Sequence, residues 1–239
     1  MSSILSVRSL NRNFGGLRAI HDLSFELQRG AITSIVGPNG AGKSTLFNMF
    51  TGYLRPTSGQ ILFNNKSIVG LPPHLICGRG IARAFQIAKP FPQLSVEKNI
   101  WVAAEFGASG YRDPAAVVEH AIETCRLLPW RHAEASSLSV GTLRRLELAC
   151  AMAARPTLLL ADEPCAGLNE TETREVTDVL LEIKAAGVTV LLVEHDMKAV
   201  RRISGRVIVI EAGRKIADGP PSDVLSNQVV IDAYLGSAA

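Results

Sequence analysis

The stretch of sequence that decides the fold is Gly37-Pro38-Asn39-Gly40-Ala41-Gly42-Lys43-Ser44-Thr45. It has the spacing GxxxxGK[ST], follows an apolar run that ends at Val36, and opens a helical pattern from Leu46 to Met49. A strand, a glycine-rich turn and a helix in this order are the context that the motif requires. The glycines let backbone N–H groups turn inward, and the helix points its positive end at the same place, so the loop favours phosphate oxygens.

Two side chains at the end of this loop extend the prediction from phosphate to a nucleoside triphosphate. We expect the Lys43 ammonium to bridge the outer phosphates. Ser44 supplies a hydroxyl oxygen to Mg²⁺, a hard cation that takes few protein ligands and leaves its other positions to phosphate and water. The loop therefore predicts binding of a nucleoside triphosphate with Mg²⁺.

A pair of carboxylates ends a second apolar run, Leu158-Leu159-Leu160-Ala161-Asp162-Glu163-Pro164. Alone, an Asp-Glu pair at a strand end is usually a solvated turn, but a phosphate-binding loop elsewhere in the chain favours a functional interpretation. We expect Asp162 to hold Mg²⁺ through water. Glu163 points to the other side and is expected to polarise the water that attacks the γ-phosphorus.

The apolar runs predict an α/β fold with a mostly parallel sheet. Several runs are apolar on both faces, which is typical of parallel strands covered by helices, and helical stretches alternate with them. The runs that we predict as strands are Ile4 to Val7, Ala31 to Val36, Thr157 to Ala161, Val188 to Val193 and Arg206 to Ile210.

The helical patterns are also readable. Asn169 is predicted as an N-cap with Glu172 at the capping-box position, and the helix continues to Gly187. A second helix carries Leu143 to Ala153. Between about residues 87 and 153 the pattern is helical with loop punctuation, which predicts a helical insertion. The tail from residue 223 predicts one short amphipathic helix.

Composition excludes several classes of protein. The 239-residue chain is 47% hydrophobic and 20% charged, so it is not mainly disordered. Lys and Arg (25) exceed Asp and Glu (22) by only 3, and the charges are scattered, so we expect no nucleic-acid partner.

No leader pattern and no run of about 18 apolar residues occurs, which predicts a cytoplasmic chain that does not itself span a membrane. Four cysteines lack metal-ligand spacing and are expected to be buried free thiols: Cys77, Cys125, Cys150 and Cys165.

With these motifs the sequence resembles the ATP-binding cassette (ABC) ATPases, which implies ATP and Mg²⁺ as cofactors and ATP hydrolysis as the activity. Gln86 matches the Q-loop glutamine of that family, which implies contact with Mg²⁺ and the attacking water. His195, in Val193-Glu194-His195-Asp196-Met197, matches the switch histidine, a donor to the γ-phosphate and the catalytic carboxylate. Phe14 occupies the A-loop position, where a ring stacks on adenine.

Leu138-Ser139-Val140-Gly141-Thr142 resembles the LSGGQ signature of the family, with departures at Val140 and Thr142. Ser139 and Gly141 stand where a helix begins, which is a second anion site. In ABC proteins this site serves the γ-phosphate of ATP held by the other protomer, so the resemblance implies that two chains close head to tail. Ala166-Gly167-Leu168-Asn169 resembles the D-loop, which lies across the dimer seam.

The resemblance implies a P-loop NTPase (RecA-like) core with a mostly parallel sheet, a small N-terminal antiparallel β region and an inserted helical subdomain. We expect one ABC ATPase domain over residues 1–239. Residues 1–86 and 154–239 form the nucleotide-binding core, and residues 87–153 form the helical subdomain.

Within the family, the motifs look most like those of the ATP-binding subunits of bacterial branched-chain amino-acid importers. The motifs that carry this resemblance are Phe14 to Leu17, Gly37 to Lys43, Gly80 to Gln86, Asp162 to Asn169, Glu194 to Met197 and Tyr234 to Gly236. The partners implied are a second ATPase subunit, the same or a sister chain, two membrane permeases and, indirectly, a periplasmic solute-binding protein. The chain would then lie on the inner face of the cell membrane.

Three alternatives stay open at this level. A urea importer or an envelope-lipid system shares these motifs. A soluble ABC ATPase acting on ribosomes or DNA usually carries two cassettes or a long coiled-coil insertion, and neither is visible. A P-loop kinase or GTPase would not explain Ser139 to Gly141 together with His195, and no guanine-reading Asn-Lys-x-Asp stretch occurs.

Overall fold

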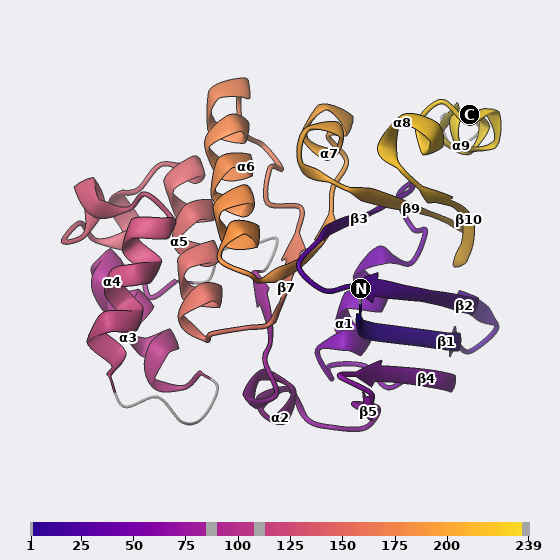
Figure 1. Ribbon diagram of the computed structural model, residues 1–239, viewed down its shortest axis with the longest axis horizontal. Coiled ribbons are helices and arrows are strands. Elements are labelled where there is room, and N and C mark those ends of the chain that lie inside the picture. Colours follow the sequence, from indigo (N-terminus) through magenta and orange to yellow (C-terminus); the bar gives the residue numbers. More distant parts are fainter. Residues whose placement is uncertain (1, 85–89, 108–112, 236–239) are drawn as a thin grey trace.

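The computed structural model describes residues 2–84, 90–107 and 113–235. The Q-loop residue Gln86 therefore lies outside the described residues. Two sheets and the helices around them form the architecture in Figure 1.

The larger sheet has six strands in the order β10-β9-β3-β8-β7-β6, and the five from β9 to β6 are parallel. Its edge strand β10 runs antiparallel to β9. The strands are β3 (Ile32–Val36), β6 (Ile81–Ala84), β7 (Leu158–Asp162), β8 (Thr189–Val193), β9 (Arg206–Glu211) and β10 (Arg214–Gly219). The predicted mostly parallel sheet is confirmed.

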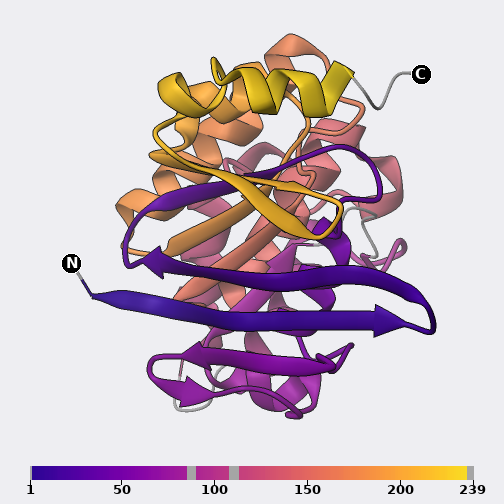
Figure 2. The same ribbon diagram turned by 90° about the vertical axis from the view of Figure 1, so that its right-hand side faces the viewer.

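A second, antiparallel sheet has the order β2-β1-β4-β5 and faces the viewer in Figure 2. Its strands are β1 (Ser3–Phe14), β2 (Leu17–Gln28), β4 (Ser58–Phe63) and β5 (Lys66–Ser67). The prediction of a strand over Ile4 to Val7 is too short, because Ser9–Phe14 continue the pairing with β2 while their polar side chains interrupt the apolar run. The N-terminal antiparallel β region is confirmed.

Helices cover both faces of the parallel sheet (Figure 1). Three of them, with two short 3₁₀ turns (Leu128–Trp130 and Ala135–Ser137), are inserted between β6 and β7. The helices are α1 (Lys43–Phe50), α2 (Pro73–Gly78), α3 (Val96–Glu105), α4 (Pro114–Thr124), α5 (Val140–Ala153), α6 (Glu170–Ala185), α7 (Met197–Ile203), α8 (Pro221–Val224) and α9 (Gln228–Leu235).

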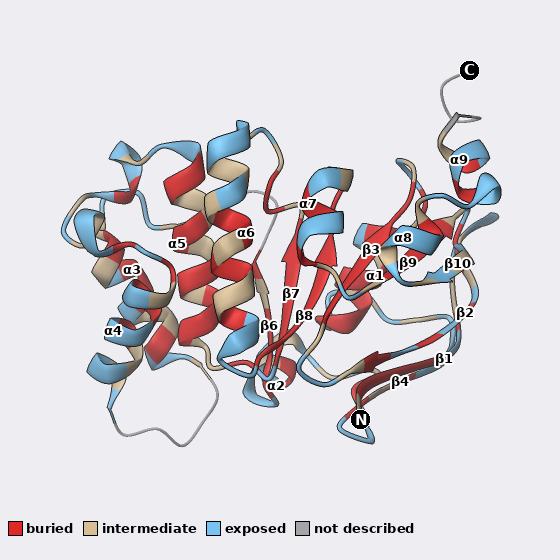
Figure 3. Cartoon of the chain, turned by 45° about the horizontal axis from the view of Figure 1, so that its top comes forward, coloured by how far each residue is buried: buried red, intermediate tan, exposed pale blue. Residues whose placement is uncertain are grey.

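The apolar core is divided by the parallel sheet. Leu159 and Ala161 of β7 pack with α3, α4, α5 and α6. Leu158 and Leu160, on the other face of the same strand, pack with α1 and the antiparallel sheet. Figure 3 shows the central strands buried and the outer helix faces exposed. Strand β7 is buried along its whole length, which explains why it reads as an unbroken apolar run.

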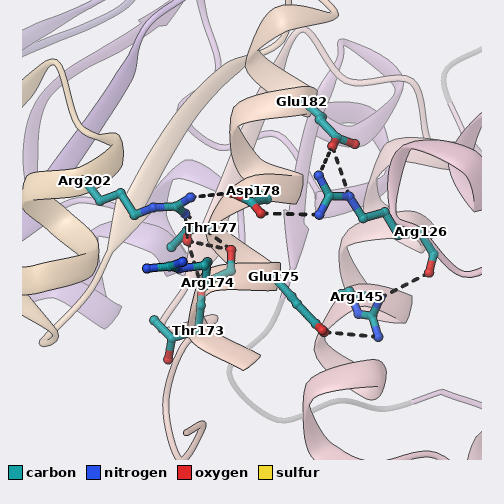
Figure 4. A network of polar contacts seen from close by, with 9 residues as sticks. All are labelled: Arg126, Arg145, Thr173, Arg174, Glu175, Thr177, Asp178, Glu182 and Arg202. Atoms are coloured by element: carbon teal, nitrogen blue, oxygen red, sulfur yellow. Dashed lines mark hydrogen bonds and ion pairs between the residues drawn. The ribbon is translucent and has the colours of Figure 1, made fainter. Parts of the chain in front are cut away.

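Charged side chains on α6 connect it to the helices on either side (Figure 4). Arg126, after α4, donates to Asp178 and Glu182 of α6. Arg202 of α7 donates to Asp178 and Thr177. These pairs are partly exposed, with Arg126 45% exposed at its side chain. The helices inserted after β6 and the helix that follows β8 thus meet through α6.

Local predictions have mixed outcomes. The capping box of α6 is confirmed, since Asn169 Oδ1 accepts from Glu172 N–H and the Glu172 carboxylate from Asn169 N–H. The prediction of a single helix in the tail is wrong. Two helices, α8 and α9, form instead, because the Asn227 side chain accepts from the Val229 N–H and starts a new helix.

All four cysteines are free, but only Cys125 and Cys165 are buried, whereas Cys77 and Cys150 are half-buried. None of the helices in the described part of the chain has the length and apolar character that crossing a membrane requires.

Candidate functional site

The glycine-rich loop joins β3 to α1, and at two of its glycines the chain leaves no room for a side chain. A Cβ at Gly42, where φ is +105°, would lie 2.6 Å from both the Ala19 carbonyl oxygen and Ile20 Cδ1. A Cβ at Gly37 would lie 1.9 Å from the Ile210 carbonyl oxygen. The loop therefore depends on glycine to let backbone approach backbone.

The helix that follows the loop has an open N-terminus. No side chain caps α1, and its first turn holds no acidic residue. Ser44 is exposed in this first turn. The N-terminus of a helix concentrates unpaired N–H groups and a partial positive charge, so this end of α1 suits an anion.

Lys43 is buried inside the loop. Its Nζ donates to the carbonyl oxygens of Gly37, at 2.7 Å, and Pro38, at 2.9 Å. Burial lowers the pKa of Lys43, and the nearby Glu163 and Asp162 carboxylates oppose this by favouring the charged ammonium. The structure thus brings the loop lysine and the two strand-end carboxylates into one electrostatic cluster.

Asp162 ends β7 and is paired with an arginine that the sequence analysis did not single out. Arg83 Nη2 lies 2.5 Å from Asp162 Oδ2, and Arg83 Nη1 donates to Asn48 Oδ1 of α1 at 2.7 Å. The Arg83 side chain is only 9% exposed. An arginine within the otherwise apolar strand β6 was the available signal, because a buried cation requires a partner.

Glu163 and His195 meet across the ends of adjacent strands. Glu163 Oε1 lies 3.0 Å from His195 Nε2. Glu163 has a φ of +49°, in the left-handed region, and its N–H donates to the Val193 carbonyl oxygen at 2.9 Å. Parallel strands β7 and β8 end at the same edge of the sheet, which explains why residues 32 apart in sequence are in contact.

Ser139 and Gly141 lie elsewhere, at the start of α5 on the opposite face of the sheet from α1 (Figure 1). Ser139 is the N-cap, and its Oγ accepts from the Thr142 N–H at 3.3 Å. A Cβ at Gly141 would lie 2.9 Å from Glu172 Oε1 at the start of α6. Within one chain the starts of α1 and α5 thus belong to helices that pack on different faces of the sheet.

The two departures from the family's signature point in different directions. Val140 is 53% exposed, whereas Thr142 is buried and its Oγ1 contacts Ser139 Oγ at 3.1 Å and accepts from Arg145 at 3.3 Å. Thr142 therefore belongs to the interior of its own chain. Phe14 is exposed at the end of β1, with the Arg12 guanidinium 4.4 Å from its ring centroid.

The residues present fit a nucleotide. Gly37 and Gly42 let the loop backbone pack against the chain's own Ile210 and Ala19 carbonyls, the helix behind the loop carries no side-chain cap, and a buried ammonium stands beside two carboxylates. These are the groups that a polyphosphate and a hydrolytic water require.

Sequence comparison agrees with this geometry. The family model for ABC transporters matches residues 20–166, and a second, described as "Branched-chain amino acid ATP-binding cassette transporter", matches residues 214–239. The chain belongs to the ABC transporter family and carries its ATP-hydrolysing cassette.

Named relatives align over nearly the whole chain. The chain is 38% identical to the high-affinity branched-chain amino acid transport ATP-binding protein BraF of Pseudomonas aeruginosa, covering 98% of each chain. It is 39% identical to LivG of Escherichia coli K12, a protein of the same description, again over 98% of each. A crystal structure of the ADP conformation of an ATP-binding cassette of an ABC transporter superposes with a TM-score of 0.89 at 29% identity, covering 99% of this chain and all of that one.

Proposed function

We propose that this chain is the ATP-hydrolysing subunit of an importer for branched-chain amino acids. The observation that carries the proposal is the contact between Glu163 and His195 at 3.0 Å, beside the loop lysine. The relatives BraF and LivG, whose names give this transport role, support the solute class.

Each site residue then has a role in hydrolysis. Lys43 and the backbone of Gly37 to Thr45 hold the phosphates. Glu163 accepts a proton from the attacking water, and His195 orients the Glu163 carboxylate and donates to the γ-phosphate. Gln86 is assigned to the metal and the water by resemblance alone, and Phe14 to the adenine ring.

Mg²⁺ would be held by Ser44, Asp162 and Gln86, with Asp162 acting through water. When bound, the metal neutralises charge on the phosphate oxygens. Hydroxyl and carboxylate oxygens are hard ligands that suit this cation. Asp162 is held in place by Arg83 and is only 4% exposed at its side chain, so its orientation is fixed before any metal binds.

The functional unit is a dimer in which Ser139 and Gly141 of one chain meet the phosphates on the loop of another. Support comes from the placement of these residues on α5, across the sheet from α1. Each nucleotide would contact the start of α1 of one chain and the start of α5 of the other chain. Neither chain alone would supply both helix starts to the same nucleotide. The second chain is the same or a sister subunit.

A large groove suits docking of a membrane permease. It has a volume of about 640 Å³ and lies between β6, α2 and the helices α3 and α5, and its lining includes Ala84 and Pro90. Its lining is mostly apolar, with Tyr53 and Phe91 exposed at its edge. We assign this groove to a permease segment, which holds the chain on the inner face of the membrane.

Residues 87–153 act as the helical subdomain that moves against the core formed by 1–86 and 154–239.

The test is uptake in cells that lack the chain. Cells that keep the other transporter components and are supplied with the chain should take up radiolabelled leucine, isoleucine or valine, and Glu163→Gln should abolish that uptake. The matched control is Glu119→Gln, the same change at a surface carboxylate paired with Arg131. Uptake of urea in place of the amino acids, or a defect confined to envelope lipids, would redirect the proposal to those alternatives.

A further inference from the structure

A buried carboxylate lies between the two loops that carry Glu163 and His195. Glu194 is the first residue after β8, and it is only 2% exposed. In the described part of the chain no cation forms an ion pair with it. A buried carboxylate without a cation must be stabilised by hydrogen-bond donors, so its contacts identify what holds it.

Three backbone N–H groups donate to this carboxylate. Glu194 Oε1 accepts from the Cys165 N–H at 2.7 Å. Glu194 Oε2 accepts from the N–H groups of His195, at 2.9 Å, and Asp196, at 3.2 Å. One oxygen therefore binds the turn after β7, and the other binds the turn after β8.

The side chain next to this contact is a neutral thiol. Burial raises the pKa of Cys165, and the adjacent Glu194 carboxylate adds to the effect. Cys165 is 6% exposed and packs in the core with the helices on that face of the sheet. The contact between the two turns is thus shielded from solvent, where charge-assisted hydrogen bonds are strong.

The turn after β7 is strained, and it needs external support. Glu163 adopts a left-handed backbone conformation, which a residue other than glycine keeps only when its surroundings fix it. The Glu163 N–H donates to the Val193 carbonyl oxygen, and the N–H of Cys165, two residues later, donates to the Glu194 carboxylate. His195 is covalently next to Glu194, so the same carboxylate constrains both ends of the Glu163–His195 contact.

The geometry points to Glu194 as a positioning residue that clamps the turn after β7 to the turn after β8 and thereby sets the contact of Glu163 with His195. Glu194 touches neither nucleotide nor the attacking water, and acts through these two side chains. The inference rests on the proposed function, in which Glu163 is the base.

The first test is kinetic and uses Glu194→Gln in the full chain. Glutamine keeps the size of the side chain but has one acceptor oxygen, and its NH₂ group faces N–H donors. We expect kcat for ATP hydrolysis to fall about 10- to 100-fold, because a base displaced by about 1 Å loses this much. KM for ATP should change less than about twofold, since the phosphate loop is untouched. Glu119→Gln is the matched control and should leave both constants unchanged.

The second test measures the coupling directly by NMR of chains labelled with ¹⁵N-histidine. The His195 ring signal is identified by its loss in His195→Ala. Glu163→Gln should move the Nε2 chemical shift in the wild-type background, and this change should shrink by at least half in the Glu194→Gln background. A residue that only supports folding would lower the melting temperature without uncoupling this pair.

The outcomes separate the inference from the proposed function. Wild-type kcat in folded Glu194→Gln, or equal ¹⁵N shift changes in both backgrounds, overturns the role of Glu194 while leaving Glu163 as the base. Full hydrolysis by Glu163→Gln would instead remove Glu163 from the role of base, on which the inference rests, and a wild-type chain that hydrolyses no ATP would overturn the proposed function itself. If Glu194→Gln does not fold, Glu194→Asp replaces it in both tests. That variant keeps the charge but lacks one methylene, and wild-type kcat with intact coupling there would equally overturn the inference.

Discussion

The two halves of the proposed composite nucleotide site differ in how they carry charge. The loop half consists of Gly37 to Thr45 with Asp162, Glu163 and His195, and it gathers a buried ammonium and two carboxylates at the end of parallel strands. The helix half consists of Ser139 and Gly141 at the start of α5, and the carboxylate beside Gly141 is that of Glu172, which caps α6. Its means of binding an anion are a hydroxyl and backbone N–H groups.

This difference suggests that the loop half carries out hydrolysis and that the helix half serves closure of the dimer. Proton transfer requires titratable groups, and these lie in the loop half. A helix start attracts an anion only within its first turn, which suits recognition of a phosphate presented by another molecule. Changes in the loop half should therefore affect bond cleavage or nucleotide affinity, and changes in the helix half should affect closure of the dimer.

The largest expected effect comes from Glu163→Gln. Removing the base should lower the rate of phosphate release about 10²- to 10⁴-fold while ATP binding is retained, because a general base contributes about this much. With ATP, a closed dimer should accumulate on size-exclusion chromatography. Normal steady-state hydrolysis by this variant would remove Glu163 from the role of base.

Lys43→Ala should come next. The loss of hydrogen bonds from a charged donor to phosphate should weaken ATP affinity about 10- to 100-fold. Titration with a fluorescent ATP analogue measures this effect. Lys215→Ala, at an exposed lysine paired with Asp218, is the control and should leave affinity unchanged. An unchanged titration with Lys43→Ala would contradict the phosphate-binding role of the loop.

Ser139→Ala tests the helix half. Loss of the N-cap should reduce the free energy of unfolding by about 1 kcal/mol. It should also weaken ATP-dependent dimerisation while the affinity of a single chain for ATP is unchanged. Ser95→Ala is a matched control, because Ser95 Oγ caps α3 through the Lys98 N–H at the same 3.3 Å distance. Equal dimerisation by both variants would show that Ser139 acts only as a cap.

The smallest effect is expected at the charged contacts on α6. Arg126→Ala breaks partly exposed ion pairs with Asp178 and Glu182, so the free energy of unfolding should fall by less than about 1 kcal/mol. The difference should disappear in about 1 M salt, where charges on the surface are screened. Chemical denaturation at low and high salt measures this. A larger loss that persists at high salt would mean that Arg126 stabilises the fold through packing of its side chain rather than through surface charge.

Local patterns predicted much of the fold and of the loop half. The strand and helix that flank Gly37 to Gly42, the cap at Asn169 and the helix start at Ser139 depend on neighbouring residues, and each is found as expected. Strands β3, β7, β8 and β9 were readable because burial on both faces makes each an apolar run.

Contacts between distant segments could not be predicted in the same way. Arg83 meets Asp162 only because β6 and β7 pair in register. The left-handed backbone of Glu163 and the inward hydroxyl of Thr142 depend on elements that fold against them. The end of β1 and the break in the tail helix are set by pairing and by one asparagine side chain, which no apolar periodicity reveals.

The lysine of the phosphate loop already has oxygen partners of its own. The carbonyl groups of Gly37 and Pro38 hold the Lys43 ammonium, so an incoming triphosphate must compete with them. The gain on binding is therefore an exchange of hydrogen bonds and smaller than the gross strength of the new ones. The same exchange applies to ADP, because the Gly37 and Pro38 carbonyls are again available to accept from the ammonium when the nucleotide leaves.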